Sequence, residues 1–482
     1  MKLNKNSKTK FSIKSIAIGL VAVVTLSTAC NEKELLNPQP ATSLGAEFVF
    51  ATPTRVLAQV NGMYSALKNG SFLGGRYPML ADIRGEEFLN RLNNIFTGYD
   101  AWNHTINSGS NDALTTWSTA YAAINSANLL IDGLVAYPAA VPAATAAQYT
   151  GEAKFVRALS YFTLITFYGQ PYVKDAGASP GIPLRLKGEA TAANMDLKRS
   201  KVSEVYAQIL KDLNDAEASL PASYSTAMLN TCRAHRNTAI SLKTRVYLNM
   251  GKYAEVIIEA KKLVPDAPPY KAPTGVANEM QANVLTIYTT NYTTTESIFS
   301  MPMAPLDYVS GQSSIGYEFN TNQEYSLAPT GILNNALWPK TDARKTMMRT
   351  NTTGTYTTKY TNPFFLDYVP VIRYPEVLLN YAEAAAKTGD VIKGIELLTA
   401  VRKRSDATFV FPAGSIATAE DLVKTILVER RIEFLAEGFR SNDLLRNLLT
   451  IPSKGVSPSI SPAQPEYIFP IPNAEISANK LL

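Results

Sequence analysis

The chain contains 482 residues, 46% of them hydrophobic, with 46 Lys and Arg against 40 Asp and Glu. A chain of this size and apolar content has enough side chains for a large buried core, in one domain or in two fused lobes. Its formal charge of +6 falls to +1 if the five lysines before residue 15 are removed with a leader. A nearly neutral protein lacks the basic field that attracts phosphate backbones, so we expect no nucleic-acid partner.

The first 29 residues have the order of a secretory signal peptide. Basic residues from Lys2 to Lys14 precede an uncharged, largely apolar run from Ser15 to Ala29. As a helix, that run would rise only about 22 Å, which is too short for a permanent membrane span. We therefore expect residues 1–29 to be removed, and residues 30–45, which lack periodicity, to form a tether.

Cys30 ends the apolar run, after Leu26-Ser27-Thr28-Ala29. Small residues before a cysteine resemble the lipobox of bacterial lipoproteins, in which the thiol receives diacylglycerol. The leucine lies four rather than three positions before the cysteine, and an ordinary signal peptide with an incidental cysteine is the alternative. We expect a lipid anchor on Cys30, which leaves Cys232 without a disulfide partner. Residues 31–34 resemble the acidic tags that send lipoproteins of Bacteroidetes to the outward-facing leaflet.

Two long helices are predicted in the first half of the chain. One face of the first carries residues spaced i, i+4, i+7 and i+11: Trp117, Tyr121, Ile124 and Asn128. The second contains Phe155–Tyr168, whose apolar residues occupy more than one face, so we expect it to be buried on several sides and to end at Gly169. A third helix is expected after an N-cap at Ser200, with one apolar stripe from Val202 to Leu213.

The same helix-pair pattern occurs twice further along the chain. Apolar stripes end at Gly251 and at Gly389, and each glycine is followed by a second stripe at matching offsets. Two helices joined at a glycine and packed antiparallel are the unit of tetratricopeptide-like arrays. The two pairs are too far apart for a regular solenoid, so we predict a mainly α fold of helix pairs in an irregular stack.

Residues 266–365 have a different character. Pro, Thr, Asn and Tyr dominate, helical stripes vanish, and only Val284–Tyr288 and Ser297–Met301 have the pattern of short strands. A non-helical segment of this length inside a compact protein is usually functional or disordered. Because aromatic residues recur throughout it, we expect a variable, loop-rich functional region.

A charge-dense segment runs from Glu429 to Arg446. Its glutamates at 429, 433 and 437 would repel one another unless arginines pair them, so we expect a structural ion-pair network, and the same for Arg373 with Glu376 and Asp342 with Arg344. Glu86 and Glu87 are the nearest suggestion of a catalytic carboxylate pair, but adjacent residues usually point in different directions. No HExxH, GxSxG, Walker or GxGxxG pattern occurs. We therefore expect no enzyme, no metal and no cofactor.

Several motifs in order resemble the SusD/RagB family of nutrient-binding outer-membrane lipoproteins. They are the Trp117 helix, EAKFVRALSYFTLITFYG from Glu152, Gly181–Leu184, RSKVSEVYAQILKDL from Arg199, Arg373–Glu376 with Asn380–Ala384, ERRIEFLAEGFRSNDLLR from Glu429, and Phe469–Pro472 with Glu475 and Asn479. The resemblance implies a SusD-like superhelical scaffold in two helical parts, residues 46–265 and 366–482, which flank the variable region 266–365. It also implies a SusC-like TonB-dependent transporter as partner.

The resemblance implies a lipoprotein of the cell outer membrane, facing the exterior, that binds an oligosaccharide first and a peptide second. A surface hydrolase of the same material and a helical scaffold that binds only protein are the alternatives. Sugar rings stack on aromatic side chains and need polar groups at their rims. By residue chemistry and loop position alone, the ligand-binding candidates are Tyr99, Trp102, Asn103, Tyr308, Tyr317 and Trp338. We expect Trp102 to be exposed, because neither helical stripe includes it.

Overall fold

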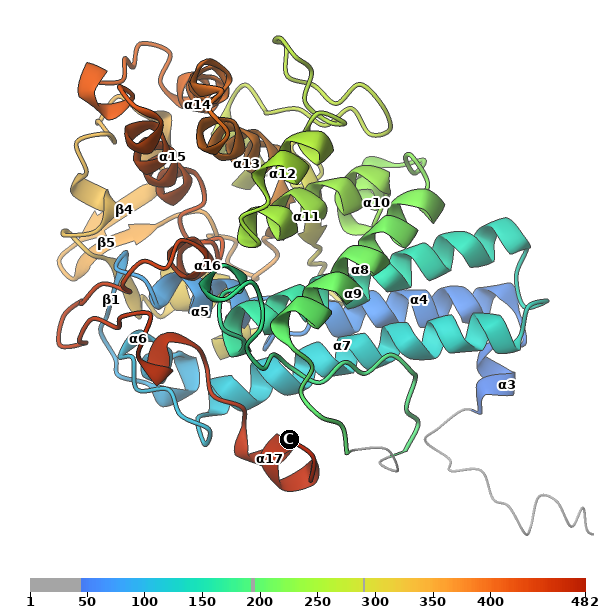
Figure 1. Cartoon of the computed structure of the whole chain (residues 1–482). Helices are drawn as coiled ribbons and strands as arrows, with labels where there is room; N and C mark the ends of the chain where they lie inside the picture. Colours follow the sequence, from blue (N-terminus) through green and yellow to red (C-terminus); the bar gives the residue numbers. More distant parts are fainter. Residues whose placement is uncertain (1–44, 192–195, 289–290) are drawn as a thin grey trace, which may run out of the picture.

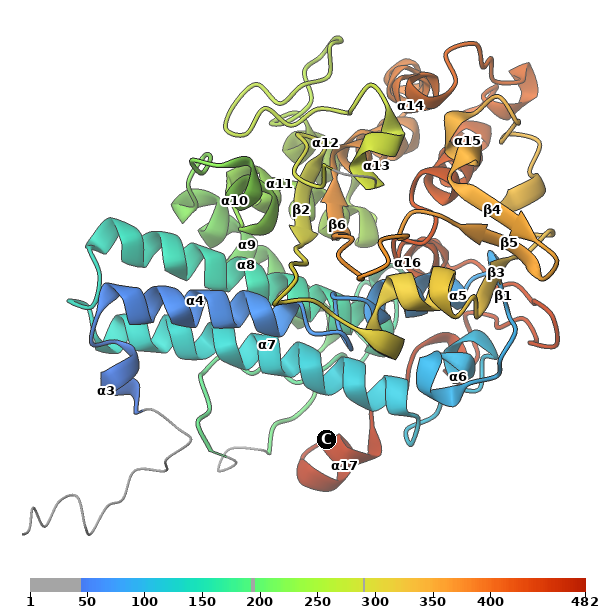
Figure 2. The ribbon, with the colours of Figure 1, turned by 180° about the vertical axis from the view of Figure 1, so that it is seen from behind.

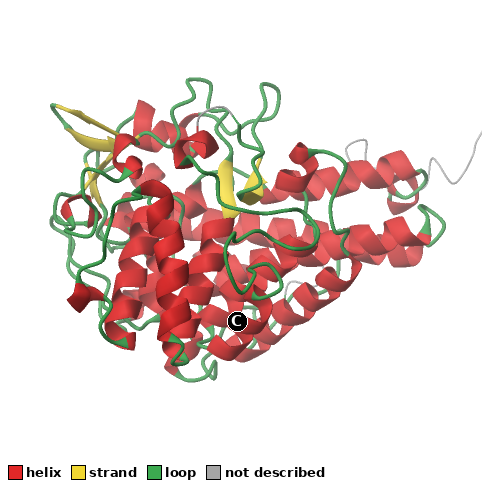
Figure 3. Cartoon of the chain, turned by 90° about the horizontal axis from the view of Figure 1, so that it is seen from above, coloured by secondary structure: helices red, strands yellow, loops and turns green. Residues whose placement is uncertain are grey.

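The computed structural model describes residues 45–191, 196–288 and 291–482. Helices dominate and strands are few and short, as Figure 3 shows, so the predicted mainly α fold is confirmed. Cys30 and the predicted signal peptide lie outside the described residues. None of the helices in the described ranges combines the length and hydrophobicity that crossing a membrane requires.

Four long helices form the first half of the molecule: α4 (Pro53–Leu67), α7 (Asn111–Ala136), α8 (Ala143–Tyr168) and α9 (Val202–Ser219). They lie side by side in Figures 1 and 2. Every residue of α8 from Phe155 to Tyr168 is buried, which confirms the prediction of a helix covered on several sides. Shorter helices surround them: α3 (Ala46–Val49), α5 (Arg76–Ile83), α6 (Tyr99–Trp102) and α10 (Ala227–Cys232).

The start of α9 differs from the prediction by one residue. Its N-cap is Lys201, whose backbone N–H is bound by the Glu204 side chain at 2.8 Å. Ser200 instead pairs through its backbone with Gly181 and Ile182, so the expected Ser200 cap is wrong. The apolar stripe from Val202 to Leu213 is buried as predicted.

Both predicted helix pairs are present. They are α11 (Arg236–Asn249) with α12 (Tyr253–Ala260), and α13 (Tyr374–Lys387) with α14 (Val391–Ser405). Gly251 and Gly389 between the helices have φ angles of 68° and 93°, a left-handed conformation that side chains with a Cβ rarely adopt. The helices α15 (Ala419–Glu433), α16 (Arg440–Arg446) and α17 (Asn473–Ala478) complete the C-terminal part.

Short strands form three antiparallel pairs among the described residues: β1 (Phe88–Asn90) with β3 (Tyr325–Leu327), β2 (Ser297–Met301) with β6 (Val369–Arg373), and β4 (Met348–Asn351) with β5 (Gly354–Thr357). The predicted strand Ser297–Met301 is therefore confirmed. Val284–Tyr288 is a 3₁₀ helix instead, because Val284, Ile287 and Tyr288 pack into one small apolar cluster at a helical spacing.

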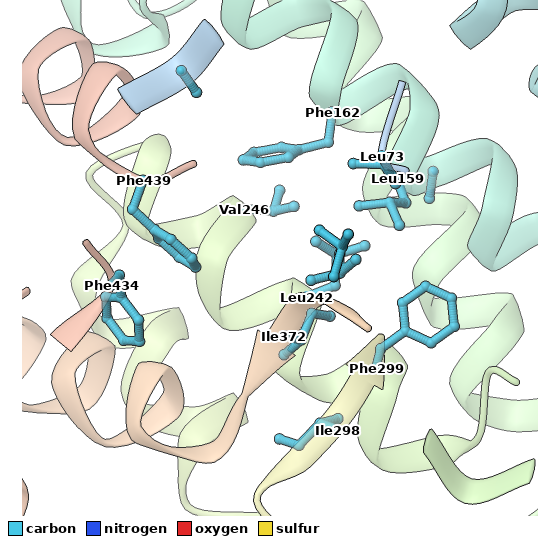
Figure 4. Packing of buried hydrophobic residues seen from close by; sticks show 14 of the residues in the cluster. Leu73, Leu159, Phe162, Leu242, Val246, Ile298, Phe299, Ile372, Phe434 and Phe439 are labelled. Atoms are coloured by element: carbon cyan, nitrogen blue, oxygen red, sulfur yellow. The ribbon is translucent and has the colours of Figure 1, made fainter. Parts of the chain in front are cut away.

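One large core joins the helical halves through the β2–β6 ribbon. Figure 4 shows Phe299 from β2 and Ile372 from β6 among Leu159 and Phe162 of α8 and Leu242 of α11. All five side chains are at most 2% exposed. The loop-rich region is thus fixed to the scaffold through its strands.

The predicted ion-pair network and the pair of Asp342 with Arg344 are confirmed, and the network lies deeper than the sequence indicates. The expected pairing of Arg373 with Glu376 is wrong, because Arg245 binds Glu376 with two guanidinium nitrogens. We call the network the buried charge cluster; it contains Arg344, Lys359, Arg373, Arg402 and Arg404 with Glu296, Asp342, Glu429, Glu433 and Glu437, each side chain at most 4% exposed. Although burial opposes it, the surrounding arginines hold the pKa of Glu433 well below its usual range. The cluster connects the loop-rich region to β6, α14 and α15.

Candidate functional site

A pocket of about 380 Å³ opens between α4, α10 and the chain that follows β2. We call it the α4–α10 pocket. Figure 2 shows these three elements next to one another. Helix α4 contributes Asn61, Ser65 and Lys68 on one face, Met228 comes from α10, and Asp307 comes from the loop-rich region. Binding sites for small organic ligands begin at about this volume.

Two aromatic residues, Tyr64 and Tyr368, line the pocket. Tyr368, which lines it, stacks on Tyr292 with ring centroids 4.8 Å apart and an angle of 14°. The Tyr292 hydroxyl donates to Asp367 at 2.8 Å, and the Tyr368 hydroxyl donates to Met228 Sδ at 3.3 Å. Burial raises the pKa of Tyr368 to about 12, so its hydroxyl stays protonated. These contacts fix both rings before any ligand arrives.

A tight turn forms the rim. Ala304 and Asp307 exchange two backbone hydrogen bonds of 2.9 and 3.1 Å, and Leu306 at the tip is fully exposed. Tyr308 follows directly and its side chain is 45% exposed. The rim therefore offers apolar and aromatic surface to solvent.

The wall beside α8 is held by a fixed ion pair. Arg233 donates to the fully buried Glu152 from Nε at 2.9 Å and from Nη2 at 2.8 Å. The Tyr64 hydroxyl donates to the same carboxylate at 2.8 Å. The backbone N–H of Ala234 donates to Tyr64 Oη at 2.9 Å. These polar groups are satisfied within the chain and shape the pocket.

Trp102 does not have the exposure that the sequence suggested. Its ring is 4% exposed, and its indole N–H donates to the Phe88 carbonyl at 2.8 Å. The ring is covered by Gly455 and by the Lys454 ammonium, 5.9 Å from its centroid. The expectation of an exposed Trp102 is wrong, because contacts from a segment some 350 residues later enclose it.

The other predicted ligand residues divide between surface and interior. Trp338 is 3% exposed, with the Lys345 ammonium 4.0 Å from its ring. Tyr99 is half-buried against Trp102, and the Asn103 side chain accepts a hydrogen bond from Ser457. Tyr317 packs against Phe365. None of the six predicted residues is among those that line the pocket, but Tyr308 follows the pocket-lining Asp307 directly and is exposed beside it.

The residues that line the pocket, Tyr368 and Lys68 among them, were not predicted from the sequence as ligand residues. Tyr368 lies three residues beyond the boundary drawn for the loop-rich region, and Lys68 caps an ordinary amphipathic helix. The recurrence of tyrosines after residue 288 is a sequence signal that could have identified Tyr368 as a candidate. Lys68 gave no signal, because its partner Asp307 is 239 residues away.

Other hollows suit a ligand less well. A larger one, of about 410 Å³, lies beside α7, but Tyr121, Asn125 and Asn128 use their side chains there to bind backbone carbonyls of residues 183–189. A cavity of about 30 Å³ between Phe162, Arg245 and Glu437 has room for water only. The hollow beside α7 is large enough for a ligand, but the three side chains of α7 are already engaged there, and the cavity between Phe162, Arg245 and Glu437 is too small.

Glu86 and Glu87 are committed to arginines. Arg431 contacts both carboxylates, at 3.0 and 2.5 Å, so the two side chains converge, contrary to the expectation from their adjacency. Burial opposes ionisation, but Arg440 and Arg431 lower the pKa of Glu86 to about 2. A general acid needs a raised pKa, so this pair is suited to structure rather than to glycoside cleavage.

Three other carboxyl groups have raised pKa values because they are buried. The pKa is about 9 for Glu318, about 7 for Asp82 and about 6 for Asp112. Each of these side chains is at most 2% exposed. Within the described residues, no group of three or more His, Cys, Asp or Glu side chains is arranged to hold a metal ion.

A preformed pocket on a helical scaffold is an arrangement typical of binding proteins. A family described as "Starch-binding associating with outer membrane" matches residues 54–248, and the SusD family matches residues 277–459. A SusD superfamily protein from Bacteroides fragilis is 30% identical, with a TM-score of 0.82 over 90% of this chain and 99% of that chain. This chain belongs to the SusD family, whose members are carbohydrate-binding nutrient-uptake proteins of Bacteroidetes.

More distant relatives have the same extent and fold. SusD-like protein P2 of Formosa agariphila is 23% identical over 98% of this chain and 99% of the relative. A SusD-like carbohydrate binding protein from Bacteroides vulgatus is 18% identical, with a TM-score of 0.75 over 89% of this chain and 97% of that chain. The helical scaffold therefore persists while the sequence changes.

Proposed function

We propose that this chain is a surface-exposed lipoprotein that binds an oligosaccharide in the α4–α10 pocket and delivers it to a SusC-like TonB-dependent transporter. The observation that carries the proposal is the pocket of about 380 Å³ beside the stacked pair Tyr292 and Tyr368. Flat rings accept the apolar face of a sugar, while Asn61 and Ser65 present an amide and a hydroxyl to its rim. A peptide is the second ligand class.

The chain binds its ligand without cleaving it. The carboxylates nearest the pocket wall are engaged, Glu152 by Arg233 and Asp307 by Lys68. Time-resolved product analysis on glycans and peptides tests this statement. Cleavage that is abolished by one carboxylate substitution would show instead that the chain is a hydrolase.

The binding test uses the full chain purified in detergent and calorimetry against neutral glycans, acidic glycans and peptides. Tyr368→Ala removes the ring that lines the pocket and should weaken the best ligand roughly fivefold or more. Tyr253→Ala on α12 is the matched control and should bind like the unmodified chain. Equal binding by the Tyr368 variant would contradict the proposed site, and a peptide as the best ligand would replace the oligosaccharide.

The anchor and the partner are tested in cells. Metabolic labelling with palmitate should mark the chain, and Cys30→Ala should abolish the label. Proteolysis of intact cells should degrade an outward-facing protein, and purification from the membrane should retain a TonB-dependent barrel. Persistent labelling of the Cys30 variant, or purification without a barrel, would contradict the respective part of the proposal.

A further inference from the structure

Lys68 occupies an unusual position in the α4–α10 pocket. It caps the C-terminal end of α4, and its side chain is 8% exposed. Among the described residues, both polar contacts of its ammonium go to Asp307, at 2.5 Å to the carboxylate and 3.1 Å to the carbonyl. The Asp307 side chain is 68% exposed. A largely buried cation therefore depends on a partner at the surface.

The remaining charges of the pocket do not neutralise Lys68. Arg233 lines the pocket, and its charge is balanced by Glu152, which it binds bidentately. If the Asp307 carboxylate moves away, the pocket retains one uncompensated positive charge. An ammonium left without a partner in a largely buried position is unfavourable, so an anion from solution would be attracted to it.

Asp307 is suited to move. It lies in the exposed turn from Ala304, next to Leu306, whose side chain contributes nothing to the core. Rotating the Asp307 side chain into solvent leaves the turn's two backbone hydrogen bonds intact. A carboxylate from a ligand would restore the partner that the Lys68 ammonium needs, so the exchange of one carboxylate for another is nearly neutral for the fold.

We infer that a carboxylate of the ligand replaces that of Asp307 on Lys68, so that the pocket selects acidic oligosaccharides over neutral ones. The inference rests on the proposed function and names its ligand class. A sugar carboxylate has the charge and planar shape of the group it displaces. Ser65 and Asn61 lie one and two turns before Lys68 on the same helix face, where they reach the hydroxyl groups of the same ring.

The test measures the affinity of the full chain in detergent for paired glycans by calorimetry. Each uronate oligosaccharide is compared with its methyl-esterified form, and each sulfated oligosaccharide with its desulfated form. The uronate should bind roughly tenfold or more tightly than its ester, because a charge-assisted contact is lost on esterification. A preference confined to the sulfated pair would overturn the assignment to a carboxylate.

Two variants distinguish a role of Lys68 in ligand binding from a purely structural role. Lys68→Met keeps the apolar stem and should abolish the preference for the uronate, while Asp307→Asn removes the competing carboxylate and should tighten uronate binding severalfold. Lys211→Met, at an exposed pair with Asp215 on α9, is the control and should change neither. Thermal unfolding of each variant verifies that it is folded.

The outcomes distinguish this inference from the proposed function. If neutral and acidic glycans bind equally, or if Asp307→Asn weakens the uronate, the inference is overturned and glycan binding stands. If no glycan binds, the proposed function fails with it. If the uronate preference survives in Lys68→Met, another cation selects the ligand, and the pair of Lys68 with Asp307 has only a structural role.

Discussion

Two sets of ion pairs in this chain have opposite surroundings. In the buried charge cluster, Arg373 contacts Glu296, Glu433 and Glu437 at 2.6 to 2.9 Å, and all four side chains are at most 1% exposed. In the α4–α10 pocket, Lys68 has one partner among the described residues, and that partner is exposed. A charge with several buried partners is fixed in place, whereas a charge with one exposed partner can exchange it for a ligand.

The buried charge cluster stabilises the fold, whereas the ion pair in the α4–α10 pocket can change when a ligand binds. Removing one member of a buried network leaves other charges unpaired in the interior, which is strongly destabilising. Removing an exposed partner leaves a charge that water or a ligand can reach.

The largest effect is expected from Arg373→Ala. The substitution leaves three glutamates without this partner, so the free energy of unfolding should fall by about 3–5 kcal/mol. Denaturant unfolding measures it, and Lys211→Ala at an exposed pair should lose at most about 1 kcal/mol. A loss below 1 kcal/mol for the Arg373 variant would mean that the cluster is not fixed as described.

Trp102→Phe tests whether this residue belongs to the scaffold rather than to the site. The variant keeps an aromatic ring but removes the N–H that binds the Phe88 carbonyl, so stability should fall by about 1–3 kcal/mol. Ligand affinity should be unchanged by calorimetry. Weakened binding with an unchanged unfolding midpoint would restore Trp102 as a ligand residue.

Glu318→Gln tests a buried carboxyl group that is not part of the buried charge cluster. Burial, reinforced by Glu324, raises the pKa of Glu318 from 4.5 to about 9. The folded chain therefore keeps a proton that the unfolded chain releases above about pH 4.5, and this group's contribution to stability is lost as the pH rises from 4.5 to 9.

The Gln variant cannot ionise and should therefore lose less stability between pH 5 and 8 than the unmodified chain. The expected difference is at least about 1 kcal/mol, since one pKa unit corresponds to about 1.4 kcal/mol. Glu420→Gln, at an exposed pair with Lys424, is the control. Parallel pH profiles for the Glu318 variant and the unmodified chain would contradict the raised pKa.

Tyr308→Ala should give the smallest effect and only on binding. The side chain is 45% exposed at the pocket rim, so losing its ring should weaken an oligosaccharide by about 1 kcal/mol. The unfolding midpoint should not move, and Tyr308→Phe should retain the affinity. A lower midpoint with unchanged affinity would place Tyr308 with the scaffold.

Sequence periodicity predicted the scaffold well. The spacing around Trp117, the many-sided apolar pattern of Phe155–Tyr168 and the glycines at 251 and 389 each led to an element that is present. These signals are local, because the helix repeat places the residues of one face within a few positions of each other. Val284–Tyr288 was misassigned because five residues do not distinguish a helical from a strand repeat.

The site was harder to predict, because its contacts join distant segments. Trp102 lies in a helix of four residues, too short for a stripe, and its burial depends on Phe88 and Gly455. The role of Lys68 could not be predicted, because it depends on the ion pair with the distant Asp307. Residue chemistry selected Tyr308 as a candidate, and its contact with ligand stays a prediction that rests on its position next to Asp307.

Ligand bound in the α4–α10 pocket should protect the backbone amides around it from exchange. Hydrogen–deuterium exchange of the full chain, with and without a saturating concentration of the best oligosaccharide, measures this protection. Exchange should slow in residues 228–233 and 301–308, which border this pocket. Protection confined to residues 121–128 and 185–191, around the hollow beside α7, would contradict binding in the α4–α10 pocket.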